Sequence, residues 1–398
     1  MGEESTQQYF TFLAGTTKNP VHLHVDRAKG VYLYDNKGRR YLDMIAGISV
    51  NNLGHNHPAI VSAVREQLDK FLHVMVYGDL TGQTQVDLAR ELAGHLPGKL
   101  RKIYFVNSGS EAIEGALKLS RRFTGRHEWI AFRKAYHGST MGALSVMGGE
   151  YFKRAFRPLV PGTRFLDFND PDQLNAITDK TAAVLVEPVQ GEAGIILPEK
   201  GYLEAVRQRC DETGTLLIFD EVQTGFGRTG EMFAFQKYKV QPDILVLAKA
   251  LGGGLPLGAF ISSSPIMETL TYNPELGHIT TFGGHPLSCA AGLASLRILS
   301  TELPVFQIAK KAKIIRDIFS NHPLIKEVRG TGLLFAIDTG TSGILDKFVR
   351  RSLHNGLITD FFLFDDSSFR ISPPLTISEE ELTFGCRLML QTLEEVSA

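Results

Sequence analysis

The chain is poor in cysteine, has no excess of charge of either sign and contains no long apolar run. Its three cysteines, Cys210, Cys289 and Cys386, are an odd number without a Cys-x-x-Cys spacing. A disulfide framework is therefore not expected, and a reducing compartment is favoured. No stretch approaches the ~20 apolar residues typical of a membrane span, and the opening residues MGEESTQQYF are too polar for a signal peptide. We expect a cytoplasmic protein without a membrane-spanning segment.

The balance of charge excludes two classes of partner. The 42 Lys and Arg residues almost cancel the 43 Asp and Glu residues, which leaves a formal net charge of −1. Without a basic block, the chain lacks the electrostatic footprint of nucleic-acid or anionic-membrane binding. Glycine contributes 39 of the 398 residues, roughly 10% against a usual ~7%. This excess is clustered, and the clusters carry the functional prediction.

The middle of the chain alternates short apolar runs with segments of helical period. The runs are continuous rather than alternating, as in strands that are buried on both faces of a parallel sheet. Helical segments at 111–123 and 201–212 lie between some of them. This rhythm predicts an α/β fold with a large, mostly parallel sheet flanked by helices on both sides. The predicted strands are Lys102–Val106, Ala182–Glu187, Leu216–Asp220, Ile244–Leu247 and Gly258–Ser262.

The two ends of the chain have different patterns. Near the start, 30–35 and 40–44 flank a turn at 36–38 and predict an antiparallel hairpin. From about residue 290, two helices (290–300 and 305–322) and a strand pair (332–338 and 368–371) predict a smaller α+β domain. We therefore expect an N-terminal segment (1–50) that packs with the small domain, a large domain (51–290) and a C-terminal small domain (291–398).

Three patterns suggest other ligands but do not support them. Gly94–Lys99 is one residue too short for a phosphate loop, and Gly330–Gly332 lacks the third glycine of a dinucleotide fingerprint. The histidine pairs His22/His24 and His55/His57 have no further ligands at a recognisable metal spacing, so no metal is expected.

The turn after the first predicted strand combines capping with a potential anion site. Ser108 and Glu111 have the Ser-x-x-Glu spacing of a capping box, which alone explains them structurally. Gly109 and Ser110, however, place small residues and free N–H groups at a helix N-terminus, where a phosphate can bind. Both interpretations stay open at this point.

An aspartate and a lysine follow two further apolar strands. Asp220 ends one strand, and Lys249 comes directly after the next and precedes three glycines. The aspartate alone could be a metal ligand, and the lysine alone could be a strand-end residue that reaches solvent. A buried lysine also has a lowered pKa that suits Schiff-base chemistry. A lysine, an acid and an anion site in this order suit one cofactor, pyridoxal 5′-phosphate, which needs partners for its aldehyde, ring nitrogen and phosphate.

Taken in order, these motifs resemble the class III pyridoxal-phosphate aminotransferases, the acetylornithine, ornithine and 4-aminobutyrate aminotransferase type. The likeness covers nearly the whole chain. It runs from LDMIAGISVNNLGHNHP through NSGSEAIEGALKLSR, AYHGST, VEPVQGEAG, IFDEVQTGFGRTG, LAKALGGGLPLGA and TTFGGHPLSCAA to FRISPPL. The resemblance implies a fold type I homodimer whose active sites lie at the subunit interface.

The resemblance also implies roles for individual residues. Lys249 is the expected Schiff-base lysine and Asp220 the partner of the ring nitrogen. Arg370 is expected to grip a substrate carboxylate, and Glu192 to pair with that arginine while the donor is bound. Further cofactor-binding residues are expected at Ser108, Gly109, Ser110, Tyr136, His137, Glu187, Val222 and Gln223, with Thr281 contributed by the other subunit.

Two departures from the family pattern concern the amino donor. Ser139 stands where an arginine usually holds the donor's carboxylate, and Ile48 stands where ornithine enzymes tend to carry a tyrosine that contacts the donor. The resulting prediction is a ping-pong transaminase that moves an amino group from an ω-amino donor to 2-oxoglutarate. The alternative is an aminomutase or decarboxylase that uses the same cofactor. A non-catalytic role predicts the loss of Lys249 or Asp220, and both residues are present.

Overall fold

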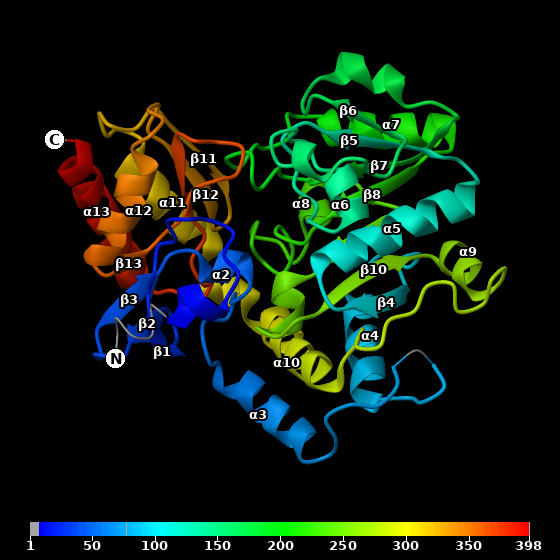
Figure 1. Cartoon of the computed structure of the whole chain (residues 1–398), viewed down its shortest axis with the longest axis horizontal. Helices are drawn as coiled ribbons and strands as arrows, with labels where there is room; N and C mark the ends of the chain where they lie inside the picture. Colours follow the sequence, from blue (N-terminus) through cyan, green and yellow to red (C-terminus); the bar gives the residue numbers. More distant parts are fainter. Residues whose placement is uncertain (1–7, 77, 398) are drawn as a thin grey trace.

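A seven-stranded sheet is the largest element of the computed structural model, which describes residues 8–76 and 78–397 (Figure 1). Its strand order is β4-β10-β9-β8-β7-β5-β6. β10 is antiparallel to both of its neighbours, β4 and β9, and the other neighbouring pairs in this sheet are parallel. The strands are β4 (Lys102–Val106), β5 (Glu128–Phe132), β6 (Thr163–Leu166), β7 (Thr181–Val186), β8 (Leu216–Asp220), β9 (Ile244–Leu247) and β10 (Gly258–Ser262).

The strand predictions are largely confirmed. β4, β8, β9 and β10 have the predicted bounds, and β7 begins and ends one residue earlier than predicted. β5 and β6 are not among the predicted strands; β5 begins with a charged residue, Glu128, and β6 carries Arg164 in its middle.

Helices cover both faces of this sheet because successive strand residues point to opposite sides. Ile218 of β8 packs in one core with Ile113 of α5 (Gly109–Thr124). Leu217 and Phe219 belong to the other core, together with Val206 of α7 (Tyr202–Thr213). Every residue of β8 is buried, which explains its continuous apolar run. The prediction of a large, mostly parallel sheet between helices is thus confirmed.

Two smaller sheets and three helices form the left part of the molecule in Figure 1. The predicted hairpin is present, and its strand β3 pairs in parallel with β13, so it lies beside the C-terminal elements. The division into 1–50, 51–290 and 291–398 stays a prediction. One sheet holds β1 (Val25–Lys29), β2 (Tyr32–Asp35), β3 (Arg40–Asp43) and β13 (Leu357–Ile358), and the other β11 (Glu327–Thr331), β12 (Leu334–Asp338) and β14 (Ser368–Ile371); the helices are α11 (Ile308–Phe319), α12 (Leu345–His354) and α13 (Glu379–Ser397).

One helix corrects the expectation about apolar runs. Residues 286–306, which include α10 (Pro286–Glu302), are long and apolar enough to cross a membrane by length and composition. Half of the apolar window is buried inside the fold, where α10 packs against α3 (Pro58–Leu68) and α4 (Gln83–Gly94). We therefore interpret it as a core helix. Short helices complete the chain: α2 (Ala46–Ser49), α6 (Met141–Ser145), α8 (Ala234–Tyr238) and α9 (Ser264–Met267).

Candidate active site

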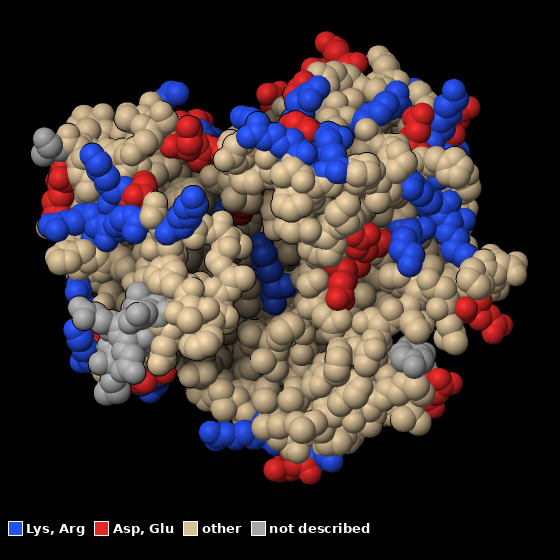
Figure 2. Space-filling model, in the orientation of Figure 1, with Lys and Arg blue, Asp and Glu red and all other residues tan. Residues whose placement is uncertain are grey.

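The parallel strands end at one edge of the large sheet, and the segments that follow them line a cavity of about 380 Å³. This is the edge at which open α/β sheets bind ligands. Figure 2 shows the molecule hollowed between its two parts, with basic side-chain atoms in the depth of the hollow. The cavity is lined by Val50, Asn107, Ser108, Gly109, Ser110, Tyr136, His137, Gly138, Glu187, Glu192, Asp220, Val222, Gln223, Ala248, Lys249 and 254–257.

Lys249 lies at the end of β9 in a strained backbone conformation. Its φ is 52°, in the left-handed region that costs a non-glycine residue roughly 1–3 kcal/mol. Burial lowers the pKa of its ammonium group, and the nearby Arg370 lowers it too, while the carboxylates of Glu192, Asp220 and Glu187 act in the opposite direction. A lysine with a lowered pKa is available as an amine nucleophile and as a proton carrier.

Asp220 is held in place at the end of β8 by two hydrogen bonds. Its Oδ1 accepts a hydrogen bond from the amide of Val222 at 3.0 Å, and its Oδ2 lies 2.8 Å from Nδ1 of His137. Both side chains are almost fully buried. The other ring nitrogen of His137, Nε2, is buried and has no hydrogen-bond partner among the described residues. His137 therefore orients Asp220 from the loop after β5.

The N-terminus of α5 forms the anionic-ligand end of the cavity. Ser108 caps the helix by accepting a hydrogen bond from the amide of Glu111 at 3.2 Å, which is the serine half of the predicted capping box. The Glu111 carboxylate accepts instead from the backbone amide of Asn107 at 2.8 Å. Gly109 and Ser110 follow in the first turn and line the cavity. Gly138 has a φ of +123°, and a Cβ there would lie 2.2 Å from the Ser110 Oγ, so only glycine lets this loop approach the helix. Capping and a potential phosphate site therefore coexist.

Two buried polar side chains lie between these ends. Burial, reinforced by the charge of Asp220, raises the pKa of the Glu187 carboxyl well above its usual value, which favours its protonated form. Gln223 is 7% exposed, and its amide nitrogen has no hydrogen-bond partner among the described residues. A buried donor without a partner is costly unless a ligand satisfies it.

Arg370 and Glu192 form a buried ion pair at the cavity wall. Arg370 is 0% exposed, and its Nη2 lies 2.8 and 2.9 Å from the two carboxylate oxygens of Glu192. The guanidinium also lies 4.4 Å from the centre of the Phe362 ring. Its Nε and Nη1 have no hydrogen-bond partner in the described part of the chain. Glu192 lines the cavity and Arg370 lies behind it.

Comparison with known proteins identifies the family. The family model described as aminotransferase class-III matches residues 13–393. The chain belongs to the class III aminotransferases. The acetylornithine aminotransferase of Methanocaldococcus jannaschii is 41% identical over 380 residues, 92% of each chain. That of Methanopyrus kandleri is 43% identical over 360 residues, 89% of this chain and 90% of that protein.

The fold comparison agrees with this assignment. A crystal structure of ornithine aminotransferase from Toxoplasma gondii, described as having partial occupancy of PLP at its active site, matches with a TM-score of 0.91 and 28% identity. The match covers 100% of this chain and 95% of that one. The protein is therefore an aminotransferase of the pyridoxal-phosphate-dependent type I fold, and its cofactor is pyridoxal 5′-phosphate.

The cavity of this aminotransferase fits that cofactor. It offers a lysine with a lowered pKa at the wall, a helix N-terminus for a phosphate and a fixed carboxylate for the ring nitrogen. The unpartnered amide nitrogen of Gln223 adds a donor for an oxygen of the ring. The predicted cofactor set thus comes together around one cavity, apart from Thr281, while the individual roles stay predictions.

Besides Arg370, three positions singled out in the sequence lie outside the cavity lining. Thr281 is exposed on this chain, Ile48 is half-buried with a φ of 60°, and Ser139 is exposed near Tyr136. From the N-terminal segment, Val50 lines the cavity instead of Ile48. Asn107 is a lining residue that motif reasoning missed as a site residue, although it stands directly before the Ser-Gly-Ser turn.

Proposed function

We propose that this aminotransferase moves the amino group of an ω-amino donor, such as N-acetylornithine, ornithine or 4-aminobutyrate, to 2-oxoglutarate in two half-reactions. The ion pair of Glu192 and Arg370 carries the proposal. Arg370 is fully buried next to Glu192 of the cavity wall, and its Nε and Nη1 have no partner among the described residues. Release of Nη2 from Glu192 would complete a fork that suits a bidentate contact with a substrate carboxylate. The names of the two archaeal relatives support N-acetylornithine as a donor.

The pair gives the cavity two states, one for each substrate. While Glu192 neutralises Arg370, no free guanidinium attracts the carboxylate of the donor, and the amino end is presented to Lys249. When Glu192 swings away, Arg370 holds one carboxylate of the 2-oxo acid. Because Arg370 contacts only the 2-oxo acid and not the donor, one cavity accepts two different molecules in turn.

Lys249 and Asp220 perform the chemistry in this proposal. The bound cofactor supplies an electron sink for the negative charge that develops at the substrate carbon. Asp220 would hold a proton at the ring nitrogen of the bound cofactor, and His137 holds Asp220 in position through the contact at 2.8 Å. Lys249 would act as the general acid and base that takes up and returns the proton of the substrate carbon. Val222 and Tyr136, which line the cavity, would contact the two faces of the bound ring.

The charge of the cavity restricts the donor. Lys249 is the one cation among the described residues that line the cavity, against the carboxyl groups of Glu187, Glu192 and Asp220. Ser139 supplies no charge that could anchor a donor carboxylate. We therefore propose that the far end of the donor is held without an ion pair, so that a diamine is accepted beside N-acetylornithine.

The proposal includes a cytoplasmic homodimer. On this chain, Thr281 is exposed and followed by Phe282, which is 53% exposed. An exposed aromatic beside a polar residue suits a subunit interface, and it supports Thr281 as a phosphate contact for the other subunit. Light scattering of the purified protein tests the dimer, and a monomer with full activity would contradict it.

A substrate panel tests the function. The purified enzyme with cofactor is incubated with 2-oxoglutarate or pyruvate and one donor: N-acetylornithine, ornithine, 4-aminobutyrate or a diamine. We expect glutamate from 2-oxoglutarate, and alanine from pyruvate at a much lower kcat/KM. Equal efficiency with both acceptors would refute the role of Arg370. Release of carbon dioxide or a rearranged amine without any acceptor would replace the transaminase with the decarboxylase or mutase.

A further inference from the structure

Two arginines lie in one row across the small antiparallel sheet. Arg329 of β11 is paired with Ala336 of β12, and Ala336 is paired with Arg370 of β14. Residues directly opposite one another in an antiparallel sheet point to the same face. Two strand spacings separate the arginines by about 10 Å. Ala336, which lies between them in the row, packs in one apolar cluster with Ile195 and Phe362.

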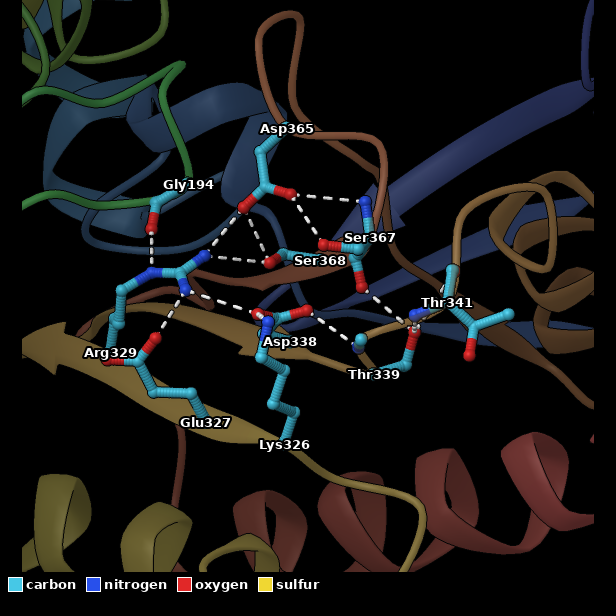
Figure 3. A network of polar contacts seen from close by, with 11 residues as sticks. Gly194, Lys326, Glu327, Arg329, Asp338, Thr339, Thr341, Asp365, Ser367 and Ser368 are labelled. Atoms are coloured by element: carbon cyan, nitrogen blue, oxygen red, sulfur yellow. Dashed lines mark hydrogen bonds and ion pairs between the residues drawn. The ribbon is translucent and has the colours of Figure 1, made fainter.

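Both arginines hold the loop that carries Glu192. Arg370 contacts the side chain of Glu192, as described above. The Nε of Arg329 donates to the carbonyl oxygen of Gly194 at 2.8 Å, two residues further along the same loop (Figure 3). A Cβ at Gly194 would lie 2.1 Å from the Asp365 Oδ2 and 2.8 Å from the Arg329 Nη2, so the loop packs tightly against this network.

Arg329 also holds the segment that covers the other side of Glu192. Its Nη2 donates to Asp365 at 2.6 Å and to Ser368 at 2.9 Å. The neighbour of Asp365, Phe364, donates its amide to the carbonyl oxygen of Glu192 at 3.0 Å. The contacts form a closed ring from Arg329 through the Glu192 loop and the 363–365 segment back to Arg329, as Figure 3 shows in part.

The two arginines differ in how completely they are paired. All three guanidinium nitrogens of Arg329 have partners, including Glu327 at 2.7 Å and Asp338 at 3.4 Å. Arg370 leaves Nε and Nη1 without partners in the described chain. One arginine is therefore fixed by several charge-assisted bonds, while the other has a single ion-pair partner that it can exchange for a ligand.

We propose that Arg329 is a positioning residue that fixes the backbone around Glu192, so that only the side chain of Glu192 moves when Arg370 takes the acceptor. This inference rests on the proposed function of the Glu192–Arg370 pair. It assigns to Arg329 a specific effect on the acceptor half-reaction. The polar contacts of Arg329 join it to no described residue at the cofactor end of the cavity, so the donor half-reaction is expected to be insensitive to it.

The test separates the two half-reactions of the Arg329→Gln and Arg329→Lys variants. Stopped-flow absorbance follows the reaction of the holoenzyme with donor alone, and of the aminated enzyme with 2-oxoglutarate alone. Calorimetry measures the affinity for glutarate, a dicarboxylate that cannot react. We expect R329Q to weaken glutarate binding and to raise the KM for 2-oxoglutarate by about 3- to 30-fold. The rate of the donor half-reaction should change less than about twofold. R329K should have an acceptor KM between those of R329Q and the wild type.

Arg207→Gln is the matched control. Arg207 is as shielded as Arg329, with 18% and 16% side-chain exposure, and it likewise bridges carboxylates, Asp211 and Asp243, in a part of the fold remote from the cavity. Arg207→Gln is expected to lower Tm without changing either half-reaction. If R329Q does not fold, Asp365→Asn breaks the same ring with a smaller change of shape and must give the same split.

The outcomes distinguish the inference from the proposed function. If the wild-type enzyme neither reacts with 2-oxoglutarate nor binds glutarate, the proposed function fails. If the wild type does both, but R329Q slows both half-reactions equally or neither, Arg329 is merely structural and the inference is overturned. In a double-mutant cycle with Glu192→Gln, we expect R329Q to have a smaller effect on the acceptor KM than it has in the wild type. If the effects of the two substitutions on KM are strictly additive in free energy, the inference is also overturned.

Discussion

Replacing Arg370 with glutamine removes the guanidinium that is proposed to bind the acceptor. In the structure the guanidinium is fully buried and shares its Nη2 between both oxygens of Glu192. Glutamine keeps part of the side-chain volume but loses the charge and the planar fork. The carboxylate of Glu192 then loses its ion-pair partner, and Lys249 is the cation that remains near it among the described lining residues.

The magnitude follows from the bonds that are lost. A hydrogen bond to a charged group contributes about 1.5–3 kcal/mol. A bound acceptor gains two such bonds, but Arg370 first gives up its contact with Glu192, so we take the net loss as one bond. This corresponds to a decrease of roughly 10- to 150-fold in kcat/KM for 2-oxoglutarate. Removing one partner of a buried ion pair also lowers the free energy of unfolding. We expect a loss of about 3 kcal/mol, the lower end of the usual range, because water in the cavity can solvate the Glu192 carboxylate.

Steady-state kinetics with a diamine donor measures this effect. The rate is recorded at varied 2-oxoglutarate with saturating donor, and then at varied donor with saturating acceptor. Arg370→Gln should raise the KM for 2-oxoglutarate and leave the donor KM within about twofold. Arg228→Lys is the control, because Arg228 is equally buried but hydrogen-bonds Leu333 and Pro373 outside the cavity. Equal effects of R370Q on both substrates would refute the assignment of the acceptor site.

Three further predictions concern the cofactor end, the donor and stability. Asp220→Asn should lower kcat by about 10²–10³-fold while the protein still binds the cofactor, as its absorbance reports; unchanged kcat would show that Asp220 does not act on the ring. Ser139→Arg should strengthen the binding of donors that carry a carboxylate, so that 4-aminobutyrate saturates the enzyme at about tenfold lower concentration while a diamine is unaffected; steady-state kinetics with both donors would expose an equal effect on the two. Burial raises the pKa of the Glu221 carboxyl to about 7. The protonated carboxyl therefore stabilises the folded state fully below the unfolded pKa, and this contribution is lost as the pH rises through 7. Denaturant unfolding should show a decrease in the free energy of unfolding between pH 5 and 8, and Glu221→Gln should make that decrease smaller.

The fold was largely accessible from the sequence because its central strands are buried on both faces. Strands such as β8 and β9 are then continuous apolar runs with clear ends. The same reason made Asp220 and Lys249 conspicuous, since a charged residue directly after a buried strand needs a function or a partner. Local patterns of this kind are visible within a few residues of the chain.

Contacts between distant segments were not accessible in the same way. Glu192 and Arg370 are 178 positions apart, and only the resemblance to a family suggested that they pair. The contact of His137 with Asp220 spans 83 positions, and His137 was expected to bind the cofactor rather than to orient that aspartate. The row of Arg329, Ala336 and Arg370 depends on strand register, which no short motif encodes.

The central claim is that Lys249 and pyridoxal phosphate together transfer an amino group. The most direct measurement is the absorbance spectrum of the purified wild-type and Lys249→Ala proteins with cofactor, before and after a donor is added without an acceptor. We predict that the wild type is yellow and loses this absorbance with the donor, and that adding 2-oxoglutarate restores it. Lys249→Ala should stay folded and show neither change at a comparable rate. A wild-type protein that cannot be loaded with the cofactor, or a Lys249→Ala variant with full turnover, would contradict the account.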